Sequence, residues 1–135
     1  MSKTKSIHEI TSSAYKNFDC GIQELNEYLK HFAKTNHKKG IGKTFVLIKD
    51  EYVIGFYTIS MASIEFKNIP NELRASLLRY PLPAARIGRL AIDSHFQGKH
   101  LGKILLIDAL ERIREAAHII AAHAVIVDAK NDKAK

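Results

Sequence analysis

The order of elements in the second half of the chain constrains its fold more than any other feature. Residues 84–92 have the pattern of a strand, HFQGKHLGKILL (95–106) begins a helix that runs to about residue 117, and HAVIVDA (123–129) has the pattern of another strand. A strand, a helix and a strand in this order usually form a right-handed parallel crossover. We therefore expect one parallel unit in this half of the chain.

The N-terminal segment predicts a short strand and a helix. The strand is expected at 7–10, and Asp19 is the expected N-cap of the helix. The helix is amphipathic, with apolar residues at spacings of three and four: Ile22, Leu25, Leu29, Phe32 and Ala33. The glycines and clustered cations of KTNHKKGIGK (34–43) then predict a loop.

An antiparallel hairpin is expected next. TFVLI (44–48) and YVIGFYTIS (52–60) are rich in β-branched and aromatic residues, and a short polar turn joins them. A short helix is expected at 71–78, before two prolines that favour extended backbone. Together these elements predict an α/β fold: an α+β sandwich with antiparallel N-terminal strands, then the parallel unit, and helices on both faces of the sheet.

Composition predicts a single domain outside the membrane. The chain has 135 residues, of which 46% are hydrophobic, enough for one packed core, so residues 1–135 are expected to form one domain. The start MSKTKSIHEITSS lacks the apolar centre of a secretory signal, and no stretch has the ~18 consecutive apolar residues of a membrane span. We expect a cytoplasmic protein with no membrane partner.

Charge and cysteine content limit the classes of ligand. The net charge of +7 favours polyanions such as nucleic acid or phosphorylated ligands, with a generally basic surface as the alternative. Cys20 is the only cysteine in the sequence, which excludes an intramolecular disulfide and a multi-cysteine metal site. His118 and His123 are five positions apart, which does not place them on one helix face, so no metal is expected.

Small and basic residues stand where the second-half helix begins. The first turn of a helix leaves about four backbone N–H groups without partners, beside the positive end of the helix dipole. Gly98 and Gly102 permit a phosphate to approach. Lys99 and Lys103 add charge, and Gln97 can donate through its amide. The alternative is an ordinary strand-to-helix loop with solvated lysines.

The stretch RLAIDSHFQGKHLGKILLIDAL (89–110) resembles motif A of the GNAT superfamily of N-acetyltransferases, whose Q/R-x-x-G-x-G/A loop binds the pyrophosphate of acetyl-coenzyme A. Four more stretches are similar to the acetyltransferase toxins of bacterial toxin–antitoxin pairs: FDCGIQELNEYLKHFA, YVIGFYTIS, LLRYPLPAARIGRLAID and AHAVIVDAKNDKAK. The resemblance covers nearly the whole chain. It implies a GNAT-like mixed sheet and an N-acetyltransferase activity.

The resemblance also implies which residues bind acetyl-coenzyme A as the co-substrate. Leu90, Ala91 and Ile92 would present backbone groups to the pantetheine arm. The loop and the first helical turn would surround the pyrophosphate, with Gln97, Gly98, Lys99, His100, Leu101, Gly102 and Lys103. Asn131 matches an asparagine that contacts the coenzyme after the next strand.

Toxins of this family acetylate the α-amino group of aminoacyl-tRNA, so the resemblance implies that basic residues contact RNA phosphates. The implied substrate-binding residues are Lys34, Lys38, Lys39 and Lys43 near the end of the first helix, and Arg79, Arg86 and Arg89 before and within the motif A strand. For the lysine group a solvated surface is the alternative. The resemblance further implies a ribbon-helix-helix antitoxin that covers the basic surface.

Two departures from the family pattern concern the site. His100 stands where the pattern has its middle glycine, and its side chain would either crowd the phosphates or, when protonated, attract them. In the family, the segment resembling NDKAK (131–135) leads to a tyrosine that protonates the departing thiolate, and then to further strands. We therefore expect the last strands of the fold to be missing. The exposed edge of HAVIVDA should then favour self-association, with a homodimer expected, or pairing with a strand of a partner. No catalytic residue is assigned, because packing is favoured over catalysis for Tyr57 and Tyr80.

Three hypotheses from different classes stay open. The first is an aminoacyl-tRNA acetyltransferase toxin. The second is a GNAT enzyme for a small amine or a protein N-terminus, which would need an acidic pocket. The third is a non-catalytic member that binds coenzyme or a partner protein.

Overall fold

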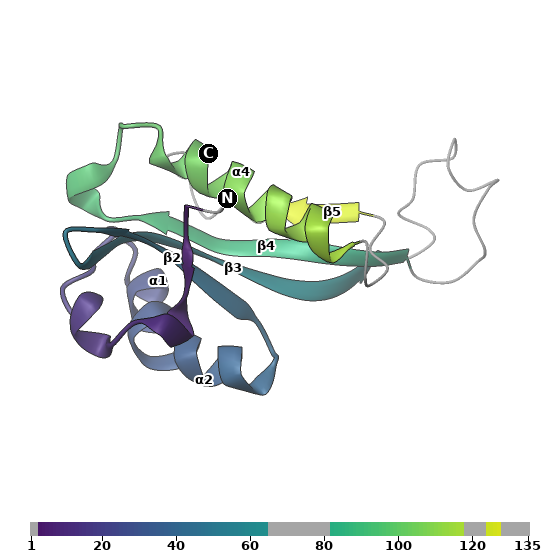
Figure 1. The fold of residues 1–135 in the computed structure, drawn as a ribbon, viewed down its shortest axis with the longest axis horizontal. Helices are drawn as coiled ribbons and strands as arrows, with labels where there is room; N and C mark the ends of the chain where they lie inside the picture. Colours follow the sequence, from purple (N-terminus) through teal and green to yellow (C-terminus); the bar gives the residue numbers. More distant parts are fainter. Residues whose placement is uncertain (1–2, 65–81, 118–123, 128–135) are drawn as a thin grey trace.

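The computed structural model describes residues 3–64, 82–117 and 124–127, which form one mixed sheet with helices on either side (Figure 1). The strands are β1 (Lys5–Ser6), β2 (Lys43–Lys49), β3 (Tyr52–Ile64), β4 (Leu82–Ile92) and β5 (Ala124–Val127). They lie in the order β1-β2-β3-β4-β5, and neighbours are antiparallel except β4 and β5, which run parallel. The predicted hairpin and parallel crossover are confirmed.

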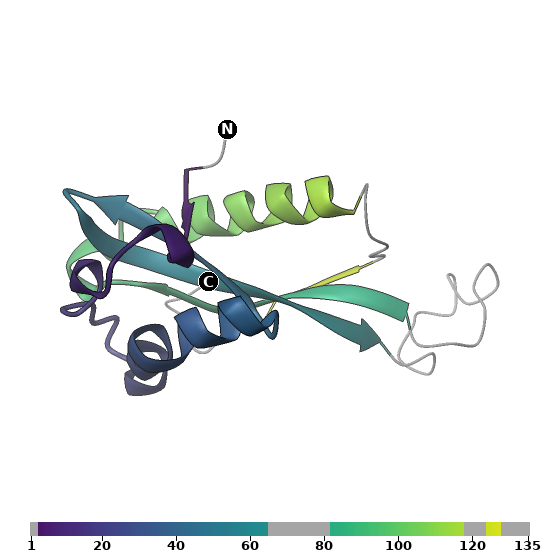
Figure 2. The same cartoon turned by 60° about the horizontal axis from the view of Figure 1, so that its bottom comes forward.

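Helices cover both faces of the sheet, as predicted. α4 (Leu101–Ala116) lies on one face, while α1 (Gln23–Glu27), the π-helical turn η3 (Tyr28–Phe32) and α2 (Ala33–Lys39) lie on the other (Figure 2). Short 3₁₀ turns in the described residues connect the longer elements: η1 (Ile7–Glu9), η2 (Ser12–Ala14) and η5 (Ser94–Phe96). None of the helices in the described ranges has the length and hydropathy to cross a bilayer.

Each face of the sheet has its own core. α4 buries Leu105, Ala109 and Ile113, whose spacing of four places them along one side of the helix. On the opposite face Leu29 and Ala33 are buried against the sheet with the same spacing. The amphipathic patterns that predicted these helices therefore correspond to their buried sides.

The N-terminal strand lies earlier than the sequence predicts. Residues 7–10 do not form a strand; Ile7–Glu9 is a 3₁₀ turn, and the strand is β1. The Ser6 hydroxyl accepts a hydrogen bond from the His8 N–H at 3.2 Å, and the Glu9 carboxylate accepts one from the Ser6 N–H at 3.0 Å. This capping box starts a helical turn where the apolar residues alone indicated a strand.

The prediction that Asp19 is the N-cap of the first helix is wrong. Ile22 takes that position. The Asp19 carboxylate instead accepts hydrogen bonds from the Gly21 N–H at 2.9 Å and from the Asn26 amide at 2.8 Å, and these two bonds lower the pKa of Asp19. Asp19 therefore shapes the turn before the helix.

The same helical segment ends later than predicted. It continues through α2 to Lys39 and closes at Gly40, whose φ of 75° is left-handed. Lys34, Lys38 and Lys39 consequently lie on a helix, where a loop was expected.

A buried carboxylate on α4 ties the N-terminus to the sheet. Asp108, which is 5% exposed, accepts hydrogen bonds from the Lys3 N–H at 3.0 Å, the Thr4 hydroxyl at 2.5 Å and the Tyr57 hydroxyl at 2.6 Å. Arg112 lies 3.4 Å from the same carboxylate. Burial and the bond to Asp108 raise the pKa of Tyr57, so this tyrosine has the packing role that the sequence favoured.

Candidate functional site

The C-terminal end of β4 carries a bulge. Phe56 of β3 pairs with Ala91, but Thr58 pairs with Gly88, so β4 has one more residue than β3 in this stretch. Arg89 lies at the bulge and has a left-handed φ of 52°. The bulge changes the direction of β4 where the coenzyme-binding strand is predicted.

The ladder between β4 and β5 stops before this bulge. Within the described residues its last pair is Ile87 with Val127, whereas β4 continues to Ile92 along β3 (Figure 1). Leu90, Ala91 and Ile92 thus lie beyond the described β4–β5 pairs. An extended pantetheine arm would need backbone groups in such a position.

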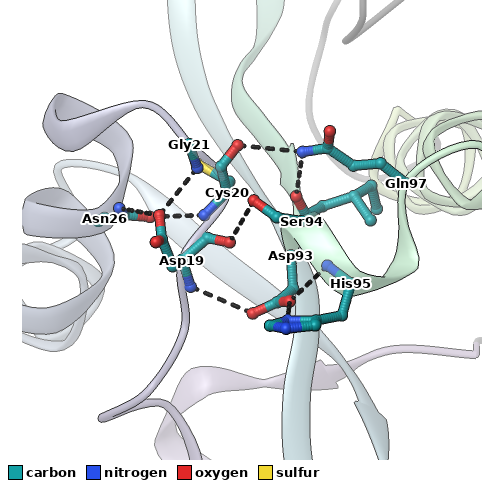
Figure 3. Close-up of polar contacts among 9 residues, drawn as sticks. Asp19, Cys20, Gly21, Asn26, Asp93, Ser94, His95 and Gln97 are labelled. Carbon is teal, nitrogen blue, oxygen red and sulfur yellow. Dashed lines mark hydrogen bonds and ion pairs between the residues drawn. The ribbon is translucent and has the colours of Figure 1, made fainter.

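A hydrogen-bond network holds the loop after β4 against the segment before α1 (Figure 3). The Asp93 carboxylate accepts hydrogen bonds from the Asp19 N–H at 3.1 Å and from the His95 N–H at 3.0 Å. Ser94 donates its N–H at 2.8 Å and its hydroxyl at 3.0 Å to the Asp19 carbonyl. Residues more than seventy positions apart therefore brace the loop.

Gln97 also belongs to this network. The sequence suggested that its side-chain amide donates to a phosphate, but in the structure the amide donates within the protein. Its side-chain N–H group donates to the Cys20 carbonyl at 3.0 Å and to the Ile92 carbonyl at 2.9 Å (Figure 3). The side chain thus bridges two segments of this protein, and the backbone N–H is the group of Gln97 that a phosphate can use. Cys20, whose carbonyl accepts this bond, is buried, and burial raises the pKa of its thiol.

Two left-handed residues shape the turn that leads into α4. Gly98 has φ 79° and His100 has φ 63°. No side chain caps α4, which begins directly after His100. Because non-glycine residues avoid this conformation, the backbone explains why the motif has a glycine at the position of His100.

The N-terminus of α4 is exposed and cationic. Lys99, His100 and Lys103 are exposed, and the first turn of α4 contains no acidic residue. Its N–H groups and the helix dipole favour an anion at this place. Lys49, which the sequence did not single out, joins Lys99 here: their Nζ atoms lie 5.5 and 5.4 Å from the centroid of the Phe96 ring. No local pattern identifies Lys49, because the β2–β3 hairpin brings it to the loop.

A cleft of about 670 Å³ lies between the α1–η3 segment and strands β3 and β4. Its lining residues are Gln23, Glu24, Leu25, Glu27, Tyr28, Phe32, Thr58, Ser60, Arg86, Gly88 and Arg89. Two predicted substrate-binding residues, Arg86 and Arg89, are brought together here, and both are exposed. Since Arg89 directly precedes Leu90, the cleft borders the predicted coenzyme strand.

The predicted lysine group does not line this cleft. Lys34 and Lys43 each donate a hydrogen bond from Nζ to a backbone carbonyl of the N-terminal half. Lys38 and Lys39 are exposed on α2. The structure therefore separates the lysines from the arginines.

Three predicted residues of interest, Arg79, Tyr80 and Asn131, lie outside the described residues, as does the helix expected at 71–78. In the described part of the chain, no group of three histidine, cysteine or acidic side chains is placed to hold a metal ion.

Residues 5–135 match the model of the Acetyltransferase (GNAT) family, and the chain belongs to this family. The match extends over nearly the whole chain and makes it an acetyltransferase. It is 36% identical over 118 residues to a protein named tRNA-acetylating toxin from Mycobacterium tuberculosis, with 87% of this chain and 70% of that protein covered.

Solved structures of toxins agree with this placement. AtaT complexed with acetyl-methionyl-tRNAfMet is 26% identical, with a TM-score of 0.84 and coverage of 97% of this chain and 79% of that chain. A tyrosine-to-phenylalanine variant of AtaT, bound to the C-terminus of the antitoxin AtaR and acetyl-CoA, is 27% identical. Its TM-score is 0.75, and the match covers 97% of this chain and 77% of that chain.

Proposed function

We propose that this chain transfers the acetyl group of acetyl-coenzyme A to the α-amino group of aminoacyl-tRNA and thereby blocks translation. One observation supports this proposal most: the cleft with Arg86 and Arg89 meets the predicted coenzyme strand at the β4 bulge. An RNA held by these arginines would bring its aminoacyl end next to the thioester. The tRNA-acetylating relative and the tRNA complex of AtaT point to the same substrate class.

The reaction requires the α-amine to attack the thioester carbonyl carbon. The C–N bond forms, the C–S bond breaks, the nitrogen loses a proton and the coenzyme thiolate gains one. In this chain, the exposed start of α4 with Lys99 and Lys103 would hold the pyrophosphate. Leu90, Ala91 and Ile92 would align the pantetheine arm through backbone hydrogen bonds, and Asn131 would add a further contact. Tyr57 does not supply the proton, because its hydroxyl is buried and donates to Asp108.

A small cationic amine is the second candidate substrate. The observation that favours it is the acidic helix side of the cleft, with Glu24 and Glu27 among its lining residues. Glu27 already lies 3.2 Å from His31 and accepts a hydrogen bond from Gln23 at 2.7 Å. The cleft thus has an acidic wall and a cationic wall. Measured rates of acetyl transfer to each substrate distinguish the two candidates.

The test is an acetyl-transfer assay with the purified chain. Acetyl-coenzyme A is offered with a pool of aminoacyl-tRNA, and the amino acids released from the RNA are analysed by mass spectrometry. Uncharged tRNA, small polyamines and a peptide with a free N-terminus are the comparison substrates. We expect acetylation of the aminoacyl-tRNA alone; acetylated polyamine or peptide in its place overturns the substrate assignment, and no turnover of any substrate supports the non-catalytic alternative.

Salt and charge reversal test the RNA contacts in the same assay. Each neutralised phosphate releases counterions, so kcat/KM for aminoacyl-tRNA should fall steeply as salt rises. Arg86→Glu combined with Arg89→Glu should lower kcat/KM more than Lys38→Glu combined with Lys39→Glu, because the arginines line the cleft and these lysines do not. A larger loss in the lysine variant would place the RNA on α2.

We further propose an antitoxin as protein partner, since AtaT is bound by the antitoxin AtaR. A ribbon-helix-helix part in that antitoxin and a homodimer of this chain are parts of the proposal. Co-purification with the product of the neighbouring gene and sedimentation of the purified chain test them. A chain that sediments as a monomer at all concentrations would contradict the dimer.

A further inference from the structure

The π-helical turn η3 places two aromatic rings along the cleft. Tyr28 and Phe32 are four residues apart, and their rings stack with centroids 6.5 Å apart and an angle of 24° between their planes. The guanidinium carbon of Arg89 lies 4.0 Å from the centroid of the Tyr28 ring. All three residues border the cleft: the two rings come from its helix side, and the Arg89 guanidinium reaches the Tyr28 ring from the strand side.

The two rings differ in exposure. Tyr28 is 7% exposed, whereas Phe32 is 56% exposed although it lies on a helix with a buried apolar side. Leaving an aromatic ring in water forgoes the favourable burial of its apolar surface. A ring exposed at a cleft, with an already ordered ring behind it, is a surface on which another flat group can stack.

The charges around the rings indicate what that group is. Arg86 and Arg89 line the strand side of the cleft, while Glu24 and Glu27 line the helix side. A phosphodiester backbone is attracted to the arginines and repelled by the glutamates. A nucleotide bound in the cleft would therefore place its phosphate toward the strands and its base toward the helix, where Phe32 lies.

We propose that Phe32 stacks on an unpaired base at the 3′ end of the acceptor RNA. This inference rests on the proposed function, because it assumes that the cleft receives aminoacyl-tRNA. Single-stranded ends expose base faces that stack on aromatic side chains, and this contact tolerates any base. Phe32 thus recognises the single-stranded character of the end, while Arg86 and Arg89 bind its phosphates.

The experiment measures binding of an acceptor-stem RNA hairpin with a 5′ fluorescent label, by anisotropy, to the full chain. One hairpin carries the single-stranded 3′ end, and a second has a blunt end. Loss of one base stack corresponds to roughly 5- to 150-fold in Kd. We expect Phe32→Ala and Phe32→Leu to weaken binding of the first hairpin within this range, Phe32→Trp to retain it, and none of them to affect the blunt hairpin.

Tyr52→Ala is the matched control. Tyr52 is also an aromatic residue with 56% exposure, and it stands on β3 outside the cleft lining. Its removal should leave both affinities unchanged. Thermal unfolding of each variant checks that the exposed side chains are dispensable for folding.

The outcomes separate this inference from the proposed function. Acetylation of aminoacyl-tRNA by the wild-type chain, together with unchanged binding by Phe32→Ala and Phe32→Leu, overturns the stacking role and leaves the activity in place. An equal loss with the blunt hairpin also overturns it. A Phe32→Ala variant that loses only antitoxin binding would make this ring a protein contact. If the wild-type chain binds neither hairpin and acetylates no aminoacyl-tRNA, both proposals fail.

Discussion

Replacing His100 with glycine should stabilise the protein. His100 has φ 63° and ψ 18° directly before α4, a left-handed conformation that costs a residue with a Cβ roughly 1–2 kcal/mol. Glycine removes this cost but loses about 0.5–1 kcal/mol more conformational entropy on folding. The net gain in free energy of unfolding is about 0.5–1 kcal/mol, which for a domain of this size raises Tm by about 2–4 °C.

Gly98→Ala is the control, because it introduces the opposite change two residues earlier. Gly98 has φ 79°, and a Cβ added there would meet nothing within 4 Å. The substitution adds backbone strain without a clash, so Tm should fall by about the amount that His100→Gly raises it. Calorimetry of the wild type and the two variants measures both shifts. If His100→Gly melts at or below the wild type while Gly98→Ala is destabilised, the His100 ring must make a stabilising contact that outweighs its backbone strain.

Three further predictions concern other parts of the structure. Gly55→Ala should lower the free energy of unfolding by about 1–3 kcal/mol in urea titrations, because its Cβ would lie 2.8 Å from Ile92 Cδ1; an unchanged midpoint would contradict the close packing. Gln97→Ala should cost about 1–2 kcal/mol for its two hydrogen bonds and weaken acetyl-coenzyme A binding in calorimetric titrations, whereas equal affinity would show that the loop keeps its shape without them. Burial lowers the pKa of His37, so the unfolded chain binds more protons and stability should fall as pH drops below about 6.5, where the unfolded histidine titrates. His37→Gln should reduce this slope between pH 7.5 and 5.5, and an identical slope would place the effect elsewhere.

The elements that the sequence predicted correctly are those with local signals. Alternating β-branched and aromatic residues marked β2 and β3, and their hairpin needs only a short turn. The strand pattern at 84–92 predicted β4 in the same way. The glycine-containing loop and the amphipathic pattern after it predicted α4. The same local pattern predicted the loop between β4 and α4, while coenzyme binding by that loop stays a prediction.

The features that were missed depend on contacts across the chain or on small changes of helical pitch. Phe32 follows Leu29 at a spacing of three, which predicts that both lie on the buried side of an α-helix. The π-helical turn η3 holds more residues per turn, which leaves Leu29 at 1% exposure and Phe32 at 56%. Gln97 bonds to the carbonyl of Cys20, 77 positions earlier, and no pattern around either residue indicates that contact.

The hydrogen bonds of the N-terminal segment constrain the order in which parts of the structure can fold. Lys3 and Thr4 donate hydrogen bonds to Asp108, which lies 105 and 104 positions later in the sequence. The Asp19 N–H donates to Asp93, which lies 74 positions later. Lys3 and Thr4 therefore gain these bonds only after α4, the last described helix, has formed, and closing such long loops slows folding. A nascent chain that has not yet reached α4 has neither the bond from Thr4 to Asp108 nor the start of the helix that would hold pyrophosphate.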